Sequence, residues 1–265
     1  MIRFDRVSKQ YANGYMALSD VTFGIGAGEL VFLTGHSGAG KSTLLKLLAL
    51  QERPTSGQIL VNEQPVHNLA QRAVPFYRRR LGIVFQDHQL LMDRTVFENV
   101  ALPLYIAGLD SHDVGRRVRA ILDKVGLLRH ERLYPMSLSS GEQQRVGIAR
   151  AMVHRPAILL ADEPTGNLDP ALSEDIFELF GRFAQLGTAI LVASHDTQLI
   201  ARFKFPVLHL SGGHLSEAAL PLPDAEPLSD TSNPDYLRCQ QGVAAVNVHE
   251  PQTLAVKSLA EEEVV

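Results

Sequence analysis

The sequence predicts an α/β fold with a mostly parallel core sheet, an antiparallel β edge and a helical subdomain. Three observations support this class. Short apolar runs alternate with helical patterns, which favours a parallel sheet covered by helices. Residues 1 to about 30 instead place apolar side chains at strand-like spacing among polar ones, which predicts short strands at an edge. Between about residues 90 and 155 the pattern is almost entirely helical.

The predicted elements belong to one domain over residues 1–216. A glycine-rich turn separates an apolar run at 30–33 from a leucine-striped helix at 41–50. Pro103, Gly108 and Pro135 divide the helical region into several helices. The remaining predictions are strands at 59–61, 81–85, 157–161 and 189–193, a helix at 172–183 and a closing hairpin that begins at 207–210.

Charge is unevenly distributed along the chain. The net charge is −4, and residues 217–265 hold nine acidic and two basic residues, a net of −7, so residues 1–216 carry +3. This mild excess argues against nucleic-acid binding, which usually requires a strongly basic face. The acidic, proline-containing segment 217–265 is predicted to be a disordered tail.

Cysteine content and hydropathy restrict where the chain works. Cys239 is the single cysteine, so the chain forms no internal disulfide, which fits a reducing cytosol. No stretch approaches 18 consecutive apolar residues, so we expect no transmembrane helix. The N-terminus shows no secretory signal pattern. If the protein works at a membrane, a partner must hold it there.

The glycine-rich turn carries the first candidate site. Residues 35–42 read Gly-His-Ser-Gly-Ala-Gly-Lys-Ser and match the phosphate-binding loop pattern. Glycines let successive backbone N–H groups point at phosphate oxygens, and the following helix adds its partial positive charge. Lys41 is expected to reach the β- and γ-phosphates, and the Ser42 hydroxyl to ligate Mg²⁺. The predicted ATP contacts are Gly35, His36, Ser37, Gly38, Ala39, Gly40, Lys41, Ser42 and Thr43.

Another apolar run ends in two carboxylates. Asp162 and Glu163 follow the apolar residues 158–161, and the carboxyl end of a strand is where α/β sheets place their ligand sites. Asp162 is expected to hold Mg²⁺, directly or through water, and Glu163 to act as the general base for the attacking water. The alternative is a strand that simply ends in solvated acids, and the phosphate loop favours the catalytic interpretation.

Residues 138–142 read Leu-Ser-Ser-Gly-Glu and resemble the signature of the ABC ATPases, usually Leu-Ser-Gly-Gly followed by Gln or Glu. In that family the signature of one subunit closes over the ATP held by a second subunit. Ser139 and nearby backbone N–H groups would then meet the γ-phosphate. Ser140 stands at a usual glycine position, and Gly141 and Glu142 complete the match. A helix cap by Ser139 or Ser140 is the other interpretation, and both can hold together.

The resemblance covers residues 1 to about 216 and implies further site residues. Gln86 matches the Q-loop residue that senses Mg²⁺, and residues 167–169 match the D-loop, which crosses the dimer interface and ends at Asp169. His195 matches the switch histidine near the γ-phosphate, and Tyr11 the aromatic residue that stacks on adenine. Each also has an ordinary interpretation: a polar loop residue, a helix cap, a surface histidine and a packed tyrosine. The resemblance implies catalysis by Lys41, Glu163 and His195, and Mg²⁺ held by Ser42, Gln86 and Asp162.

Within the ABC ATPases, three stretches, 34–48, 85–100 and 139–151, look most like the bacterial cell-division ATPases. This implies an ATP-hydrolysing subunit that dimerises on binding ATP at the cytoplasmic face of the bacterial inner membrane. It also implies an integral membrane partner, a role in division with other division proteins as candidate partners, and control of extracytoplasmic peptidoglycan hydrolases. The partner surface is expected among Leu90, Leu91, Met92, Val96 and Phe97, with packing between subdomains as the alternative.

Three other functions remain as alternatives. A lipoprotein-releasing or macrolide-type exporter subunit would have the same catalytic residues and differ only in its partner. A DNA-acting ABC ATPase usually carries a long coiled-coil or zinc-bearing insertion, and this chain has neither. A regulator that binds ATP without turnover is disfavoured by Lys41, Asp162, Glu163 and His195.

Overall fold

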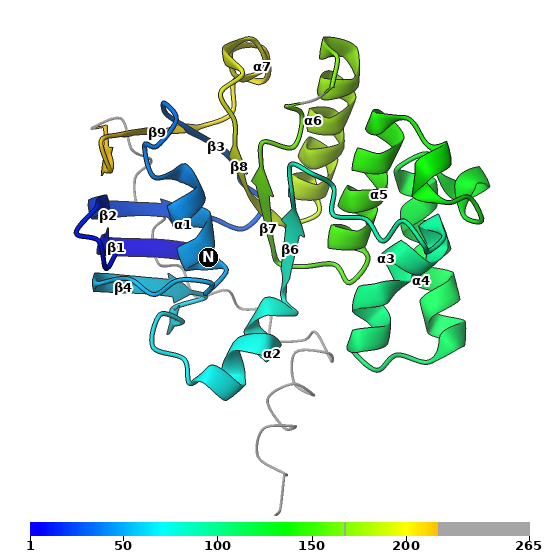
Figure 1. Ribbon diagram of the computed structural model, residues 1–265, viewed down its shortest axis with the longest axis horizontal. Helices are drawn as coiled ribbons and strands as arrows, with labels where there is room; N and C mark the ends of the chain where they lie inside the picture. The colour runs from blue at the N-terminus through cyan, green and yellow to red at the C-terminus, as the bar shows by residue number, and fades with distance from the viewer. Residues whose placement is uncertain (167, 217–265) are drawn as a thin grey trace, which may run out of the picture. The chain divides into compact units, whose positions relative to one another are not determined.

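The structure, a computed structural model, describes residues 1–166 and 168–216, and the predicted tail at 217–265 lies outside the described residues. Its central sheet has six strands in the order β10-β9-β3-β8-β7-β6 (Figure 1). Five strands are parallel, namely β3 (Leu30–Thr34), β6 (Leu81–Val84), β7 (Ile158–Asp162), β8 (Ala189–Ala193) and β9 (Val207–Ser211). The sixth, β10 (His214–Leu215), pairs antiparallel with β9. The predicted parallel core and closing hairpin are confirmed.

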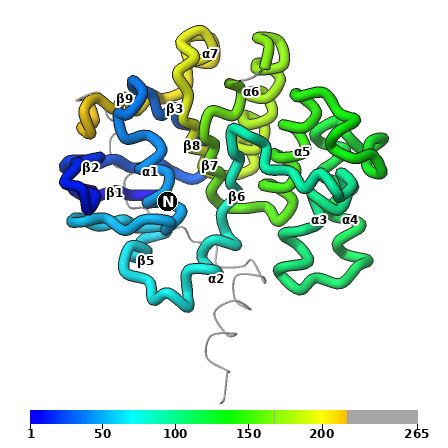
Figure 2. Tube along the Cα trace, viewed as in Figure 1, coloured from blue at the N-terminus to red at the C-terminus, as the bar shows by residue number. Residues whose placement is uncertain are grey.

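A second sheet is antiparallel and comes from the N-terminal part of the chain. Its order is β2-β1-β4-β5, formed by β1 (Ile2–Gln10), β2 (Met16–Ile25), β4 (Ser56–Val61) and β5 (Gln64–Pro65). The Ser19 N–H donates to the Gly213 carbonyl at 2.8 Å and so joins β2 to the β9–β10 turn. The colour order in Figure 2 shows these early strands grouped on one side of the parallel strands. The predicted antiparallel edge is confirmed.

Helices cover both faces of the parallel sheet (Figure 1). Because side chains alternate along a strand, Val31 and Leu33 of β3 pack with α1 (Lys41–Leu48), while Phe32 points to the other face. There Phe32 meets Phe177 of α6 (Pro170–Gln185), with ring centroids 5.1 Å apart. The sheet therefore separates two apolar clusters, and its continuous apolar strands are buried on both sides.

The helical region between β6 and β7 contains α3 (Val96–Ile106), α4 (Ser111–Lys124) and α5 (Ser140–Met152). Each begins at a residue whose side chain accepts a backbone N–H of the first turn: Thr95, Asp110 and Ser139. The helical character of this region matches the sequence expectation, and its extent as a subdomain at about 90–155 stays a prediction. Two short helices, α2 (Val74–Arg78) and α7 (Thr197–Phe203), were not predicted. Among the described residues, no helix is both long and apolar enough to span a bilayer.

Candidate functional site

The carboxyl ends of the parallel strands meet around a cavity of about 610 Å³. This volume lies within the range of about 300–1,000 Å³ that is usual for ligand sites. Strands β3, β6, β7 and β8 each contribute residues from the loop that follows them. The cavity is lined by Tyr15, Gly35, His36, Ser37, Gly38, Gly40, Lys41, Ser42, Thr43, Gln86, Asp162, Glu163 and His195. The structure thus brings together most of the residues singled out from the sequence.

The backbone of the loop between β3 and α1 depends on glycine. Gly40 caps α1 with a φ of 109°, in the left-handed region. A Cβ at this position would lie 2.5 Å from the Ala17 carbonyl oxygen and 2.9 Å from Leu18 Cδ2. No side chain fits there without moving β2, so the loop and the antiparallel sheet are packed as one unit.

The Lys41 side chain lies over the loop that precedes it. Its ammonium group donates hydrogen bonds to the carbonyls of Gly35 at 2.8 Å and His36 at 3.3 Å. Both acceptors line the cavity, so the positive charge is held at its edge. A ligand with phosphate groups would offer this ammonium stronger, charged acceptors than the two carbonyls.

Asp162, the last residue of β7, faces Ser42 at the start of α1. Burial raises the pKa of the Asp162 carboxyl, the hydrogen bond from Ser42 lowers it, and the neighbouring charge of Glu163 raises it further. A bound cation would offset this penalty because it favours the ionised carboxylate. Within the described part of the chain, no three acidic, histidine or cysteine side chains form a metal site. Mg²⁺ usually takes only one or two carboxylates and completes its shell with water and phosphate oxygens, so Ser42 and Asp162 fit it.

Glu163 and His195 form the second polar pair of the cavity. The Glu163 Oε2 lies 2.9 Å from His195 Nδ1, and the Glu163 side chain is 17% exposed while that of His195 is 73% exposed. Glu163 has a φ of 47°, which is strained for a residue with a side chain. Its N–H donates to the Ala193 carbonyl of β8 at 3.0 Å, which helps to hold this conformation. A carboxylate placed in this way can accept a proton from a group bound beside it.

Two tyrosines flank the phosphate-binding loop. The Tyr11 hydroxyl lies 3.2 Å from Thr43 Oγ1, and its ring stacks on that of Tyr15 with centroids 6.5 Å apart. The Tyr15 hydroxyl donates to the Gly38 carbonyl at 2.8 Å, and Tyr15 itself lines the cavity. Tyr11 was predicted from the sequence, whereas Tyr15 was not, because its spacing from the loop matches no motif.

The loop after β6 connects the cavity to α5. Gln86 lines the cavity, and two residues later His88 and Gln89 both have positive φ, at 55° and 46°. The Arg150 guanidinium donates to the carbonyls of His88 at 2.7 Å and Gln89 at 2.6 Å. His88 Nδ1 also donates to the side-chain oxygen of Gln144, which is fully buried. Sequence reasoning missed His88, Gln144 and Arg150, because no local pattern pairs residues this far apart.

The segment that resembles the ABC signature begins α5. The Ser139 hydroxyl accepts the Glu142 N–H at 3.3 Å, and Glu142 Oε2 accepts the Ser139 N–H at 2.8 Å. The Ser139 hydroxyl also donates to Glu142 Oε2 at 2.8 Å, and the two bonds that this oxygen accepts hold the pKa of the Glu142 carboxyl below its usual value, the backbone bond contributing most. The helix cap is therefore confirmed as a capping box. Ser139, Ser140, Gly141 and Glu142 do not line the cavity within the described residues of this chain.

The remaining predicted residues lie at the edge of the site. The Asp169 carboxylate accepts the Leu172 N–H at 3.0 Å and caps α6. Asp169 is exposed and does not line the cavity, and Asn167 lies outside the described residues. The helix-cap interpretation of Asp169 is confirmed, while its place at a dimer interface stays a prediction.

The predicted partner surface separates into buried and exposed residues. Leu90 and Val96 are buried and Phe97 packs against the core, so they serve packing. Leu91 and Met92 are 42% and 46% exposed.

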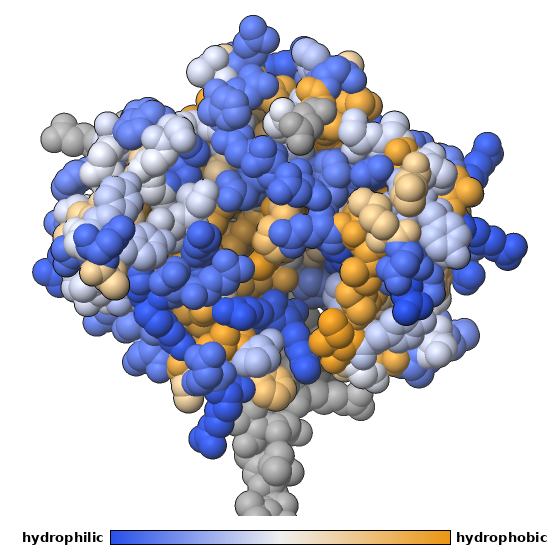
Figure 3. Space-filling view, viewed as in Figure 1, coloured by the Kyte–Doolittle hydropathy of each residue, from blue (hydrophilic) through white to orange (hydrophobic). Residues whose placement is uncertain are grey.

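Figure 3 shows apolar side chains gathered on the side of the molecule that carries α3. Three further exposed apolar residues lie on α3 and were missed by the sequence analysis: Leu102, Tyr105 and Ile106.

Comparison with known proteins places this geometry in a family. Residues 18–166 match the family described as ABC transporter. The cell division ATP-binding protein FtsE of Escherichia coli (strain K12) is 59% identical over 215 residues, which cover 81% of this chain and 97% of that protein. The protein of the same name from Haemophilus influenzae is 50% identical over 216 residues, which cover 81% and 99%.

Solved structures agree with the sequence relatives. Dimeric MJ0796, a bacterial ABC transporter cassette, is 34% identical with a TM-score of 0.74 and covers 82% of this chain and 97% of its own. A post-hydrolysis state of MJ0796 bound to ADP and Pi gives the same TM-score at 33% identity and the same coverage. This chain belongs to the ABC transporter family of ATPases, in the branch that the FtsE proteins form.

Proposed function

We propose that this chain is the ATP-binding and ATP-hydrolysing subunit of a bacterial membrane complex that acts in cell division. The observation that supports this best is one cavity in which a phosphate-binding loop, Asp162, Glu163 and His195 meet, in a chain that spans nearly the whole length of the FtsE proteins. FtsE proteins are named for cell division and ATP binding.

ATP would lie along the loop between β3 and α1. Backbone N–H groups of residues 35–43 and the N-terminus of α1 would receive its phosphates. Lys41 would exchange the carbonyls of Gly35 and His36 for the β- and γ-phosphate oxygens. The stacked rings of Tyr11 and Tyr15 lie beside the loop and would hold the adenine.

Hydrolysis to ADP and phosphate would depend on the two carboxylates after β7. Mg²⁺ held by Ser42, Asp162 and Gln86 would neutralise charge on the phosphates when bound. Glu163 would orient water and accept its proton as the bond to the γ-phosphate forms. His195, 2.9 Å from Glu163, would hold that carboxylate in place and lie near the γ-phosphate.

A second copy of the chain would complete the site. Ser139, Ser140, Gly141 and Glu142 lie outside the cavity of their own chain and start a helix whose free N–H groups suit an anion. ATP would therefore be enclosed between two copies in a head-to-tail homodimer, with Asp169 at the contact between them. The dimeric MJ0796 structure supports this arrangement.

The membrane partner would be a protein of the FtsX type, and the complex would lie at the cytoplasmic face of the inner membrane. The exposed apolar residues Leu91 and Met92 follow Gln86 on the same loop and would contact that partner. Closing and opening of the ATPase dimer would be relayed through the partner to peptidoglycan hydrolases outside the cell. No transported substrate is needed for this role.

The test is partner capture with a hydrolysis-deficient variant. Tagged Glu163→Gln protein is expected to stay dimeric in ATP and Mg²⁺ and to co-purify from native membranes with one small permease that has an extracytoplasmic domain, together with division proteins. The matched control is Glu163→Gln combined with Leu91→Asp and Met92→Asp, which should keep the dimer and lose the permease. Capture of a lipoprotein-sorting or drug-export permease would overturn the division role and leave the ATPase assignment intact.

A further inference from the structure

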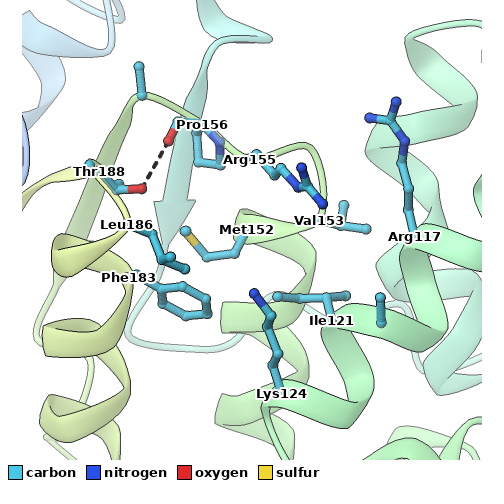
Figure 4. A pocket seen from close by; sticks show the side chains of 13 residues that line it. Arg117, Ile121, Lys124, Met152, Val153, Arg155, Pro156, Phe183, Leu186 and Thr188 are labelled. Atoms are coloured by element: carbon cyan, nitrogen blue, oxygen red, sulfur yellow. Dashed lines mark hydrogen bonds between the residues drawn. The ribbon is translucent and has the colours of Figure 1, made fainter.

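A second cavity of about 470 Å³ lies away from the nucleotide site and shares no lining residue with it (Figure 4). It is formed by α4, the C-terminal end of α5 and the C-terminal end of α6. Its floor is apolar and includes the buried side chains of Met152 and Phe183, with the exposed Leu186 at its edge. Figure 4 shows Lys124 extending its amino group from α4 toward these side chains.

Three cationic side chains line this cavity, and none of its lining residues is acidic. Arg117, Lys124 and Arg155 make no ion pair with another residue of the described part of the chain. Other cations of α4 and α6 do form such pairs. Arg116 pairs with Asp113 at 2.9 Å, Arg119 with Glu131 at 2.9 Å and Arg182 with Glu178 at 3.6 Å. On α4, the two cations that make no ion pair with a described residue, Arg117 and Lys124, are the two that line the cavity.

Compensation of helix dipoles is the simplest alternative explanation for these cations. Helices α4, α5 and α6 all end near the cavity, and a helix C-terminus carries the equivalent of about half a negative charge. Three such ends offset only about half of three full positive charges. Several of the last carbonyls also accept backbone N–H groups, such as Phe183 from Leu186 at 3.1 Å and Met152 from Arg155 at 2.9 Å. A positive excess therefore remains at the cavity.

We propose that this cavity binds an acidic peptide segment of a partner protein, which places a bulky apolar side chain on the floor and pairs its carboxylates with Arg117, Lys124 and Arg155. Arg117 and Lys124 are seven residues apart on α4, or about 10 Å along the helix axis. A peptide with several carboxylates can match this separation, whereas one small anion would have to draw both side chains together.

A membrane surface is a poorer occupant than a peptide. Surfaces that enter a bilayer present protruding apolar side chains around a basic rim. Here the apolar side chains of Ile121, Met152 and Phe183 are at most 7% exposed and form a floor, and Leu186 is the one large apolar lining residue that is mostly exposed. The cavity therefore favours a single inserted side chain.

The test measures fluorescence anisotropy of a labelled peptide, Glu-Asp-Glu-Phe-Leu-Glu-Asp-Glu, titrated with the full chain. The variant combines Arg117→Glu, Lys124→Glu and Arg155→Glu, and the control makes the same charge change at the exposed Arg72, Arg80 and Arg129. Lys124→Glu alone serves if the triple variant does not fold. Each exposed ion pair contributes modestly, so loss of three with added repulsion should raise the dissociation constant at least about tenfold.

Three results together support the proposal. The cavity variant loses peptide binding while the control retains it, replacement of the peptide's Phe-Leu by Ser-Ser weakens binding severalfold, and basal ATP hydrolysis of the cavity variant is unchanged. Equal peptide binding by variant and control overturns the proposal. It is also overturned if the peptide does not bind and phosphatidylglycerol vesicles bind to the chain but not to the cavity variant, because a lipid surface is then the occupant.

Discussion

Two loops at the carboxyl edge of the same parallel sheet obtain their shapes in different ways. The loop after β3, residues 35–40, has positive φ at Gly35, Gly38 and Gly40, where glycine carries no steric penalty. The loop after β6 has positive φ at His88 and Gln89, where side chains make that conformation unfavourable. The conformation of the first loop is therefore set by its own glycines, while the conformation of the second loop must be stabilised by contacts with residues outside it.

The second loop is held by α5. Arg150 donates to the carbonyls of His88 and Gln89, and the buried Gln144 accepts from the His88 ring. Arg150 is half-buried, and this burial lowers the pKa of its guanidinium. The same helix begins at the Ser139 cap. Gln86, at the cavity, and Ser139, at the proposed dimer contact, are therefore joined through one helix.

The largest effect is expected from Gly40→Ala in the first loop. The left-handed φ costs a residue with a Cβ about 1–2 kcal/mol, and the contact with the Ala17 carbonyl adds about 1–3 kcal/mol. ATP binding, measured with a fluorescent ATP analogue, should weaken by about two orders of magnitude or more.

Gly38→Ala is the matched control for that prediction. Gly38 has a φ of 80°, but a Cβ there would meet no atom within 4 Å. Only the backbone strain of about 1–2 kcal/mol applies, so binding should weaken by roughly 5- to 30-fold. Equal losses of ATP binding in the two variants would show that the close contact between Gly40 and Ala17 does not determine the conformation of the loop.

The second loop should respond to Arg150→Ala. The change removes two charge-assisted hydrogen bonds and should lower the free energy of unfolding by about 2–3 kcal/mol. Hydrogen exchange should become faster in residues 86–92 and remain unchanged in residues 35–42. Arg145→Ala is the control, because Arg145 pairs with the largely exposed Asp175 and should contribute at most about 1 kcal/mol. Equal acceleration in both loops would contradict the distinction between them.

The difference between the loops also explains what the sequence could predict. Strand β8 matches its predicted limits of 189–193, and β3 extends its prediction by one residue, because buried parallel strands are short apolar runs. The phosphate-binding loop could be located because its glycines and Lys41 are consecutive. The cap at Ser139 was visible because Ser and Glu stand three residues apart.

Other features depend on contacts that a single sequence does not show. Arg150 meets His88 across 62 positions of the chain, and Tyr15 reaches Gly38 across 23. Helix α7 has seven residues, too few for an apolar period to appear, although its Asp196 cap was a usable signal. Leu90 and Leu91 are adjacent and alike, yet one is buried and the other exposed, which only packing decides.

A smaller effect on stability is expected from substitutions at the start of α5. Ser139→Ala removes the side-chain acceptor of the capping box and should lower the free energy of unfolding by about 1 kcal/mol. Ser140→Ala should change it by less than about 0.5 kcal/mol, because Ser140 is exposed and caps nothing. Urea unfolding of both variants measures the difference. A larger loss at Ser140 would mean that the first helical residue, and not Ser139, stabilises this helix start.

The smallest expected effect is a pH dependence of stability that acts on the second loop and not on the first. His154 follows α5, and burial lowers the pKa of its imidazole, an effect that the nearby Leu81 backbone partly opposes. Because the pKa of His154 is lower in the folded chain than in the unfolded chain, the unfolded chain binds the proton more readily. The contribution of His154 to the free energy of unfolding is therefore fully present above about pH 6.5 and decreases as the pH drops below that value. In His154→Gln this dependence should shrink, whereas His112→Gln, at an exposed site, should leave it unchanged.

The pH effect should be local because Leu81 begins the strand that leads to the second loop. Hydrogen-exchange protection, corrected for the slower intrinsic exchange in acid, should fall in residues 81–92 at pH 5.5 relative to pH 7.5, and this fall should be smaller in His154→Gln. Residues 30–42 should show no such difference, since the backbone group that acts on the pKa of His154 belongs to Leu81 in β6. A matching fall in both segments would mean that acid weakens the whole sheet, and that the second loop is not the part of the site governed by α5.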